Sequence, residues 1–356
     1  MDTIDVAVIP GDGVGEEVTA EGVRVLEAAA RLDGGFRFAF RTFPWSCAYY
    51  LEHGRMMPED GLRTLADFAA IFLGAVGYPT VPDHISLWGL LLPIRRGFDQ
   101  YVNLRPVELM PGVTSPLRDR ESGSIRFVVI RENTEGEYSN SGGRLHTGTP
   151  YEVVVQNTVF TRMGTERIIR YAMELAERWP RRRITGATKS NGINHTMPFW
   201  DEVFRAEAER HPSLSAQLVH IDALCAFFVT RPDQFDVVVA SNLFGDILTD
   251  LGAAIQGSIG VAASANLDPE RRHPSMFEAV HGSAPDIAGQ GIANPVGQIM
   301  SARLMLEHLG KPQLAEAVGQ AVRATLAAGV RTRDLGGSAT TREVGDAVVA
   351  ALERGR

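Results

Sequence analysis

Short apolar runs alternate along this chain with longer segments in which apolar residues recur at helical spacing. Residues 5–9 predict a first strand, and Val18, Val23, Leu26 and Ala30 then recur at the spacing of one helix face. Further buried strands are predicted at residues 69–73, 126–130, 184–187 and 235–240, and helices at residues 163–178, 197–209 and 244–254. This alternation predicts an α/β fold with a largely parallel central sheet.

One segment breaks the alternation. Residues 138–150 are rich in Gly, Ser and Thr, and residues 151–155 alternate as a strand would. Two interpretations are open, a projecting arm and a loop over a site.

Length and charge narrow the class of protein. A chain of 356 residues that is 44% hydrophobic favours two lobes. The formal charge of −8 argues against nucleic-acid binding, which needs a clustered basic face. Only Cys47 and Cys225 are present, so disulfides and a cysteine–zinc site are disfavoured and a reducing cytoplasm is expected. The amino end does not resemble a signal, and no apolar stretch reaches the roughly 18 residues that span a bilayer.

Acidic residues follow the apolar run at 237–240, in the segment SNLFGDILTD. Asp246 and Asp250 are four residues apart and share one helix face near the carboxyl edge of the sheet, where α/β proteins bind ligands. Two such carboxylates repel each other unless a cation lies between them, and their oxygens suit Mg²⁺ or Mn²⁺. An isolated pair is more often a helix cap and a solvated side chain. Asp222, at the start of another apolar helix, adds a third carboxylate.

Basic residues at predicted strand ends suggest the rest of a site. Lys189 follows a buried strand, and a nearby cation would favour its neutral form and make it a general base. Arg95, Arg105 and Arg131 would together suit a substrate with two carboxylates. Tyr138 is either an acid in the same cleft or a packing aromatic residue.

Taken together, these motifs resemble the β-decarboxylating dehydrogenases, the isocitrate and isopropylmalate dehydrogenase family. The resemblance runs in fixed order through VAVIPGDGVGEEV, YVNLRP, RENTEGEY, TKSNG, SNLFGDILTDLGAAIQGSIGVAASANL and HGSAPDIAGQGIANP, and covers most of the chain. The segments ISLWGLLLPIRRGFDQYVNLRPV, RENTEGEYSNSGGR and PSMFEAVHGSAPDI look most like the tartrate and D-malate dehydrogenase (decarboxylating) branch.

The resemblance implies a fold and a set of roles. A cofactor-binding lobe would comprise residues 1–100 and 257–356, and a substrate-binding and dimerisation lobe residues 101–256. Asp246 and Asp250 would hold Mg²⁺ or Mn²⁺ together with Asp222 from a second subunit, which implies a homodimer with shared active sites. Lys189, also from the partner, would take the hydroxyl proton, and Tyr138 would protonate carbon after CO₂ leaves. Arg95, Arg105 and Arg131 would orient the substrate, and K⁺ is a further cation that the sequence leaves open.

The resemblance also implies a cofactor site that differs from the usual dinucleotide fold. PGDGVG lacks the G-x-G-x-x-G spacing and has a structural role at least as readily as a cofactor role. Asp286 would accept hydrogen bonds from the adenosine ribose and repel a 2′-phosphate, which favours NAD over NADP. The other cofactor-binding residues implied by the resemblance are Ala75, Val76, His281, Gly282, Ser283, Ala284, Ile287 and Asn294.

Substrate size depends on Trp88 and Leu91. An indole at Trp88 would fill the space that a long substituent needs, which favours the C4 acids D-malate and tartrate, although Trp88 could equally be a core residue. The alternatives are a 3-isopropylmalate dehydrogenase and a non-catalytic regulatory subunit of the same fold. Two positions depart from the family pattern: Ala279 stands where proline is usual, and Phe227 where arginine is common.

Overall fold

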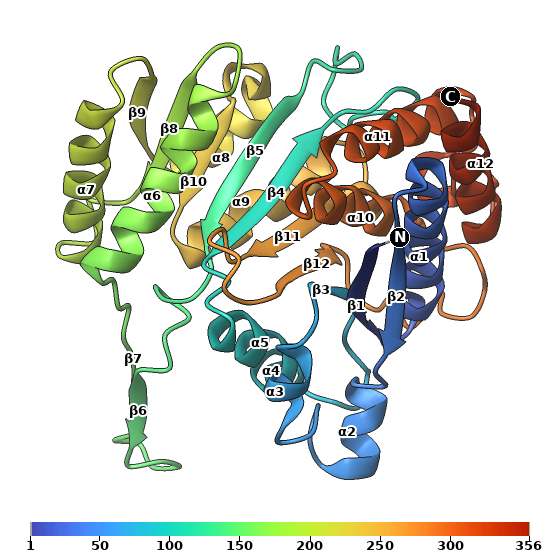
Figure 1. The fold of residues 1–356 in the computed structure, drawn as a ribbon. Helices are drawn as coiled ribbons and strands as arrows, with labels where there is room; N and C mark the ends of the chain where they lie inside the picture. Colours follow the sequence, from blue (N-terminus) through green and yellow to red (C-terminus); the bar gives the residue numbers. More distant parts are fainter. Residues whose placement is uncertain (1, 356) are drawn as a thin grey trace.

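The fold is organised around one long, twisted sheet. In a computed structural model that describes residues 2–355, the strands form a ten-stranded sheet in the order β2-β1-β3-β12-β11-β4-β5-β10-β8-β9 (Figure 1). The strands are β1 (Asp2–Gly11), β2 (Phe36–Thr42), β3 (Ala70–Ala75), β4 (Val102–Glu108), β5 (Arg126–Glu132), β8 (Arg183–Thr188), β9 (Ser215–His220), β10 (Val237–Ala240), β11 (Ala263–Leu267) and β12 (Ser275–Ala279).

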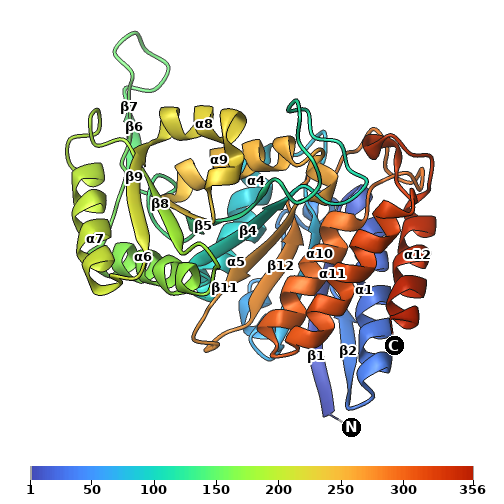
Figure 2. The same ribbon diagram turned by 90° about the horizontal axis from the view of Figure 1, so that it is seen from above.

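Helices cover both faces of the sheet. They are α1 (Val14–Asp33), α2 (Cys47–His53), α3 (Gly61–Leu65), α4 (Asp83–Ser86), α5 (Leu92–Gly97), α6 (Arg162–Glu177), α7 (Thr196–Arg210), α8 (Ile221–Thr230), α9 (Asn242–Ile255), α10 (Val296–His308), α11 (Pro312–Ala327) and α12 (Thr341–Arg354), with a π-helical turn η1 (Leu87–Leu91) before α5. Figure 2 shows α6 and the α10–α11 pair on one side of the sheet and α8 and α9 on the other. No helix of the described residues is long and apolar enough to cross a bilayer.

The sheet is parallel toward both ends and antiparallel in its centre. The pairings β2–β1, β1–β3 and β3–β12 are parallel at one end, and β5–β10, β10–β8 and β8–β9 at the other. Between them, β12–β11, β11–β4 and β4–β5 are antiparallel. The predicted α/β class is therefore confirmed, with a mixed centre. Residues 101–256 supply the half of the sheet from β4 to β9, and the rest of the chain supplies the other half.

The turn between β1 and α1 is held by a buried carboxylate. Asp12 accepts hydrogen bonds from the backbone N–H groups of Cys47 (2.9 Å), Ala48 (3.1 Å) and Gly77 (3.1 Å). Gly11 has φ +79°, and a Cβ there would lie 2.0 Å from the carbonyl oxygen of Ala75, so only glycine fits. The PGDGVG motif thus has a structural role: it ties the first turn to the loop after β3.

A two-stranded hairpin projects away from the rest of the chain (Figure 1). Among the described residues, its strands β6 (Gly142–Leu145) and β7 (Val153–Gln156) pair only with each other, and every residue in them is exposed. Of the two interpretations of this segment, the projecting arm is correct. The arm begins directly after Tyr138, so its base adjoins the site described next.

Candidate active site

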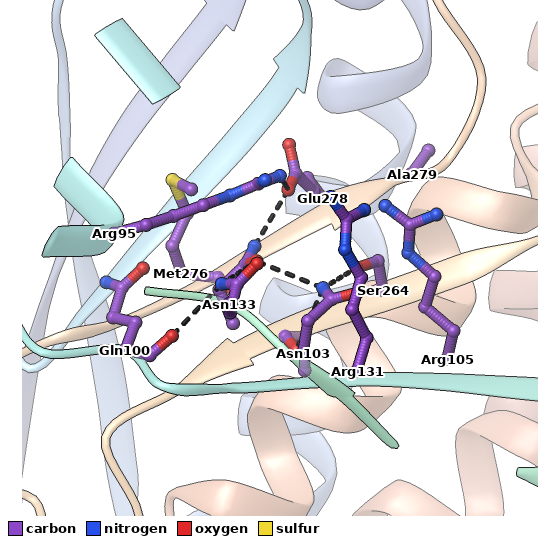
Figure 3. A network of polar contacts seen from close by, with 12 residues as sticks. Arg95, Gln100, Asn103, Arg105, Arg131, Asn133, Ser264, Met276, Glu278 and Ala279 are labelled. Atoms are coloured by element: carbon purple, nitrogen blue, oxygen red, sulfur yellow. Dashed lines mark hydrogen bonds and ion pairs between the residues drawn. The ribbon is translucent and has the colours of Figure 1, made fainter. Parts of the chain in front are cut away.

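A cavity of about 230 Å³ lies beside the antiparallel centre of the sheet. It brings together the three predicted arginines, Tyr138 and Asp246, and its lining is Gly74, Ala75, Val76, Leu87, Leu91, Arg95, Arg105, Arg131, Tyr138, Asp246, Glu278, Ala279, Val280, His281 and Gly282. Figure 3 shows Arg95, Arg105, Arg131 and Glu278 close together. Residues from α5, β4, β5, α9 and β12 thus meet at one point.

The three guanidinium groups are buried, and two of them are only partly satisfied. Arg131 donates from Nε and Nη2 to Asn242 Oδ1 (3.1 and 2.7 Å) and from Nη1 to Asp246. Arg105 donates to Thr249 Oγ1 at 2.6 Å, and Arg95 to Glu278 Oε1 at 2.7 Å. The Nε–H groups of Arg95 and Arg105 are buried without an acceptor among the described residues. Buried donors that lack partners are costly, so the cavity suits a ligand that supplies carboxylate oxygens.

Asp246 and Tyr138 form a pair at the edge of the cavity. The Tyr138 hydroxyl donates to Asp246 Oδ2 at 2.8 Å, while Arg131 binds Oδ1 of the same carboxylate. Burial and the hydrogen bond to Asp246 raise the pKa of Tyr138, so it holds its proton at neutral pH. Burial opposes ionisation of Asp246, but Arg131 and Arg105 outweigh it and lower its pKa. Tyr138 is therefore in the cleft, and Asp246 does not cap α9, which begins at Asn242.

The acidic face of α9 is compatible with a divalent cation. Burial, together with the nearby charge of Asp246, raises the pKa of Asp250, although Arg105 partly offsets this. A carboxylate whose ionisation is disfavoured by another carboxylate would gain from a cation between them. Among residues 2–355, however, no group of three or more His, Cys, Asp or Glu side chains of one chain could hold a metal ion. A complete metal site on α9 would need a ligand from elsewhere.

Lys189 and Asp222 lie apart from this cavity. Lys189 Nζ is 2.9 Å from Asp222 Oδ1, and the hydrogen bond from Lys189 lowers the pKa of Asp222. Neither residue lines the cavity, and 69% of the Asp222 side chain is exposed. Within a single chain, the structure does not bring the predicted base and the third predicted carboxylate to the arginines.

A second cavity, of about 690 Å³, adjoins the first. Its lining is mostly apolar and comprises Val14, Ser258, Ile259, Gly260, His281, Gly282, Ala284, Ile287, Ile292, Ala293, Asn294, Arg333 and Asp334. His281 and Gly282 line both cavities. Burial lowers the pKa of His281, and its Nε2 is buried without a partner in the described residues. The two adjoining cavities could take the two ends of an elongated ligand.

Most of the predicted cofactor residues line one of these cavities. Ala75 and Val76 line the first, and Ala284, Ile287 and Asn294 the second. Asn294 donates to Asp334 Oδ2 at 2.9 Å. Two residues lie differently. Ser283 is buried, and its carbonyl accepts from Val14 N at 2.8 Å, whereas Asp286 is exposed and lines neither cavity.

Trp88 is not part of the cavity wall. Its side chain is 37% exposed, and the Arg96 guanidinium carbon lies 5.0 Å from the centre of its ring. The interpretation of Trp88 as a core residue is therefore wrong. The indole does not fill the cavity either: Leu87 and Leu91 line this side of it, and Trp88 does not. Ala279, which departs from the family pattern, lines the cavity as well.

Comparison with known proteins agrees with this arrangement. The sequence profile of the isocitrate/isopropylmalate dehydrogenase family matches residues 5–348. The chain belongs to this family. It is 57% identical over 355 residues to a probable tartrate dehydrogenase/decarboxylase of Bacillus subtilis (strain 168), with 99% of each chain covered. It is 56% identical over 355 residues to the D-malate dehydrogenase (decarboxylating) of Escherichia coli (strain K12), with 98% of each covered.

A solved structure gives the same family. The isocitrate dehydrogenase of Methylococcus capsulatus superposes with a TM-score of 0.87 at 33% identity, covering 98% of this chain and 99% of that one. The family resemblance seen in the sequence motifs is thus confirmed.

Two acidic residues of this family member were missed by sequence reasoning. Glu278 lines the first cavity and binds Arg95. Glu137 accepts hydrogen bonds from Ser241 Oγ (2.7 Å) and Leu243 N (3.0 Å), and so fixes the start of α9. Both lie in quoted motifs, FEAVHGS and RENTEGEY, but only their partners in space reveal what they do.

Proposed function

We propose that this protein is an NAD- and divalent-metal-dependent dehydrogenase that oxidises and decarboxylates a small 2-hydroxy diacid, D-malate or tartrate. The observation that carries the proposal is the cavity in which Arg95 and Arg105 each leave a buried Nε–H without an acceptor, beside Tyr138 and Asp246. A diacid supplies two carboxylates, and the relatives at 57% and 56% identity bear the names of tartrate and D-malate enzymes.

The residues fit a divalent cation shared between two subunits. Asp246 and Asp250 would supply oxygens from one face of α9, and Asp222 of the partner subunit the third carboxylate. Bound Mg²⁺ or Mn²⁺ would polarise the hydroxyl and carbonyl oxygens of the substrate. The outward-facing Lys189–Asp222 pair, which does not reach the cavity of its own chain, supports this sharing.

The chain's own side chains would carry the proton transfers. Arg95 and Arg105 would orient the two carboxylates, and Lys189 of the partner subunit would accept the hydroxyl proton. Bound NAD would supply the acceptor for the hydride of C2. After CO₂ leaves, Tyr138 would give its proton to the carbon. Its raised pKa keeps Tyr138 protonated at neutral pH until that step.

The dinucleotide would lie along the two adjoining cavities. The nicotinamide end would adjoin Ala75 and Val76, and the adenosine end would lie in the apolar cavity of Ile287 and Asn294. Asp286, exposed on the same loop, would accept from the ribose hydroxyls and select NAD over NADP.

The projecting arm and the two-part site both support a homodimer of two-lobed subunits. Arm residues Leu145, Tyr151 and Val154 are 63%, 79% and 59% exposed in the single chain. An isolated two-stranded hairpin is marginally stable in water, so pairing with the arm of a second copy would stabilise it. The lobes, residues 1–100 with 257–356 and residues 101–256, would meet at the antiparallel centre of the sheet.

A second candidate substrate is 3-isopropylmalate, because Leu87 and Leu91 offer an apolar wall that Trp88 does not block. The deciding experiment measures NADH and CO₂ together for D-malate, the tartrate stereoisomers and 3-isopropylmalate, with NAD and Mn²⁺. The proposal expects the highest kcat/KM with a C4 diacid. A clear preference for 3-isopropylmalate would favour the second candidate, and no turnover of any diacid by the metal-loaded protein would point to a non-catalytic subunit.

A further inference from the structure

A chain of buried amides crosses the centre of the sheet and ends on a residue of the candidate active site (Figure 3). Asn266, in β11, donates from Nδ2 to Glu278 Oε1 at 2.7 Å. Its Oδ1 accepts from Asn103 Nδ2 and Asn133 Nδ2, both at 3.0 Å. Asn103 lies in β4, and Asn133 directly follows β5, so Asn266 links the two halves of the sheet.

The far end of this chain is the ion pair between Glu278 and Arg95. Arg95 Nη2 donates to Glu278 Oε1, the same oxygen that accepts from Asn266, and both distances are 2.7 Å. The side chains of Arg95 and Glu278 are only 5% and 8% exposed, yet both line the first cavity. One carboxylate oxygen therefore sets the direction of the guanidinium group, and the Asn266 amide sets the direction of the carboxylate.

The network would cost folding free energy if its only role were structural. Asn103, Asn133 and Asn266 are each at most 1% exposed, and the Oδ1 atoms of Asn103 and Asn133 are buried without partners in the described residues. Burying amides in a sheet centre is unfavourable unless they are fully hydrogen-bonded, and apolar residues would avoid that cost. Amides here could still fix the pairing of β11 with β4, so the test must separate this register role from a role in the site.

We propose that Asn266 is a positioning residue that acts through Glu278 to hold Arg95 in the orientation that binds a substrate carboxylate. The inference rests on the proposed function, because it assumes that Arg95 contacts the diacid. It adds that substrate affinity depends on the polar contacts across β11 and β4. It also gives Glu278 a defined role, in which Oε1 fixes one edge of Arg95 and leaves Nε and Nη1 for the substrate.

The most informative variant is Asn266→Asp, which keeps the shape and the Oδ1 acceptor but replaces the donor to Glu278 with an oxygen. Two carboxylates then face each other, and Glu278 must turn away or share a proton. The inference expects the KM for D-malate to rise roughly 10- to 100-fold, with little change in the KM for NAD. That rise should shrink as pH falls from 8 to 6, because a shared proton restores the contact.

A double variant combines Asn266→Asp with Glu278→Gln. It tests the hydrogen bond between positions 266 and 278 with the donor and the acceptor exchanged. The Gln amide can donate to the new carboxylate at position 266, and its oxygen can still accept from Arg95. The KM for D-malate should therefore fall back toward that of Glu278→Gln alone. The matched control is Ser264→Ala, which removes a 2.8 Å hydrogen-bond partner of Asn103 in the same network. Ser264 lies opposite Glu278 in the sheet, but its side chain forms no hydrogen bond with Asn266 or Glu278 among the described residues. It should lower Tm and leave the KM for D-malate unchanged.

The outcomes separate the inference from the function on which it rests. An Asn266→Asp variant with wild-type KM for the diacid and a lowered Tm would leave only the register role and overturn the inference, while the proposed function stands. Absence of rescue in the double variant would also overturn it. If the wild-type enzyme oxidises 3-isopropylmalate instead of D-malate, the same KM comparison is made with that diacid. If it oxidises no diacid, the proposed function fails, and the inference fails with it.

Discussion

The ammonium group of Lys189 lies 2.9 Å from an Asp222 carboxylate oxygen, and neither side chain reaches the cavity that holds Asp246 and Tyr138. The two groups are thus paired with each other in a single chain. In the proposed dimer they would face the cavity of the partner, where Asp222 would complete the set of metal carboxylates. The candidate base and the candidate acid of one reaction would then come from different subunits.

The projecting arm should control assembly. Replacing Val154 with Asp puts a charge on a side chain that is 59% exposed in the single chain and buried in the proposed dimer. We expect the variant to sediment as a monomer at concentrations where the wild type is a dimer, and to lose diacid oxidation with it. Leu51→Asp is the control, because Leu51 is 54% exposed on α2, away from the arm. Unchanged sedimentation of Val154→Asp would exclude the arm from the interface.

The preference for NAD over NADP should depend on Asp286. In the proposed site, Asp286→Ala would remove both the repulsion of a 2′-phosphate and the contacts of this carboxylate with the ribose hydroxyls. The ratio of kcat/KM with NADP to that with NAD should rise about 10-fold. Glu27→Ala, which removes an exposed carboxylate of α1 outside both cavities, should leave the ratio unaltered. An equal ratio in wild type and Asp286→Ala would mean that another group reads the ribose.

The free energy of unfolding should fall with rising pH because one carboxyl group is buried. Glu132 is 1% exposed, and burial raises its pKa to about 7 despite hydrogen bonds from Thr134 and Glu135. A raised pKa means that the folded state favours the protonated carboxyl group. The contribution of Glu132 to stability is therefore complete below the pKa of this group in the unfolded chain, and it is lost as pH rises through about 7.

The Glu132→Gln variant removes this titration. As pH rises from 4.5 to 8, the free energy of unfolding of Glu132→Gln minus that of wild type should increase by up to about 3 kcal/mol. Chemical denaturation at several pH values and one protein concentration measures the difference. Parallel pH profiles of the two proteins would show that Glu132 is not the titrating group.

The local elements of the fold could be predicted because their patterns are local. The uniformly apolar Val237–Ala240 forms a buried strand, and the helical period after it forms α9, within two residues of the predicted start. The antiparallel centre was not predicted, because the pairing of β11 with β4 joins segments about 160 residues apart and leaves no periodic signal. The charged residues at strand ends were informative because strand ends converge at one edge of a sheet.

Side-chain partners were harder to foresee. Glu278 stands in a β-strand sequence, and nothing local shows that it meets Arg95, which is 183 residues away. Trp88 was expected either in the cavity or in the core, but within the π-helical turn Leu87–Leu91 it is Leu87 and Leu91 that line the cavity, and the indole lies beside Arg96. Helical spacing alone does not encode that change of period.

The shared active site is tested most directly by mixing two inactive chains. Lys189→Met and Asp246→Asn each remove a group that every site needs, so each homodimer should be inactive. When the two variant chains are co-expressed in equal amounts, half of the dimers are hybrids. If Lys189 serves the partner's cavity, each hybrid has one site in which both residues are intact. The account predicts recovery of about one quarter of wild-type activity. No recovery in hybrids that are shown to form would place both residues in the same chain's site and contradict it.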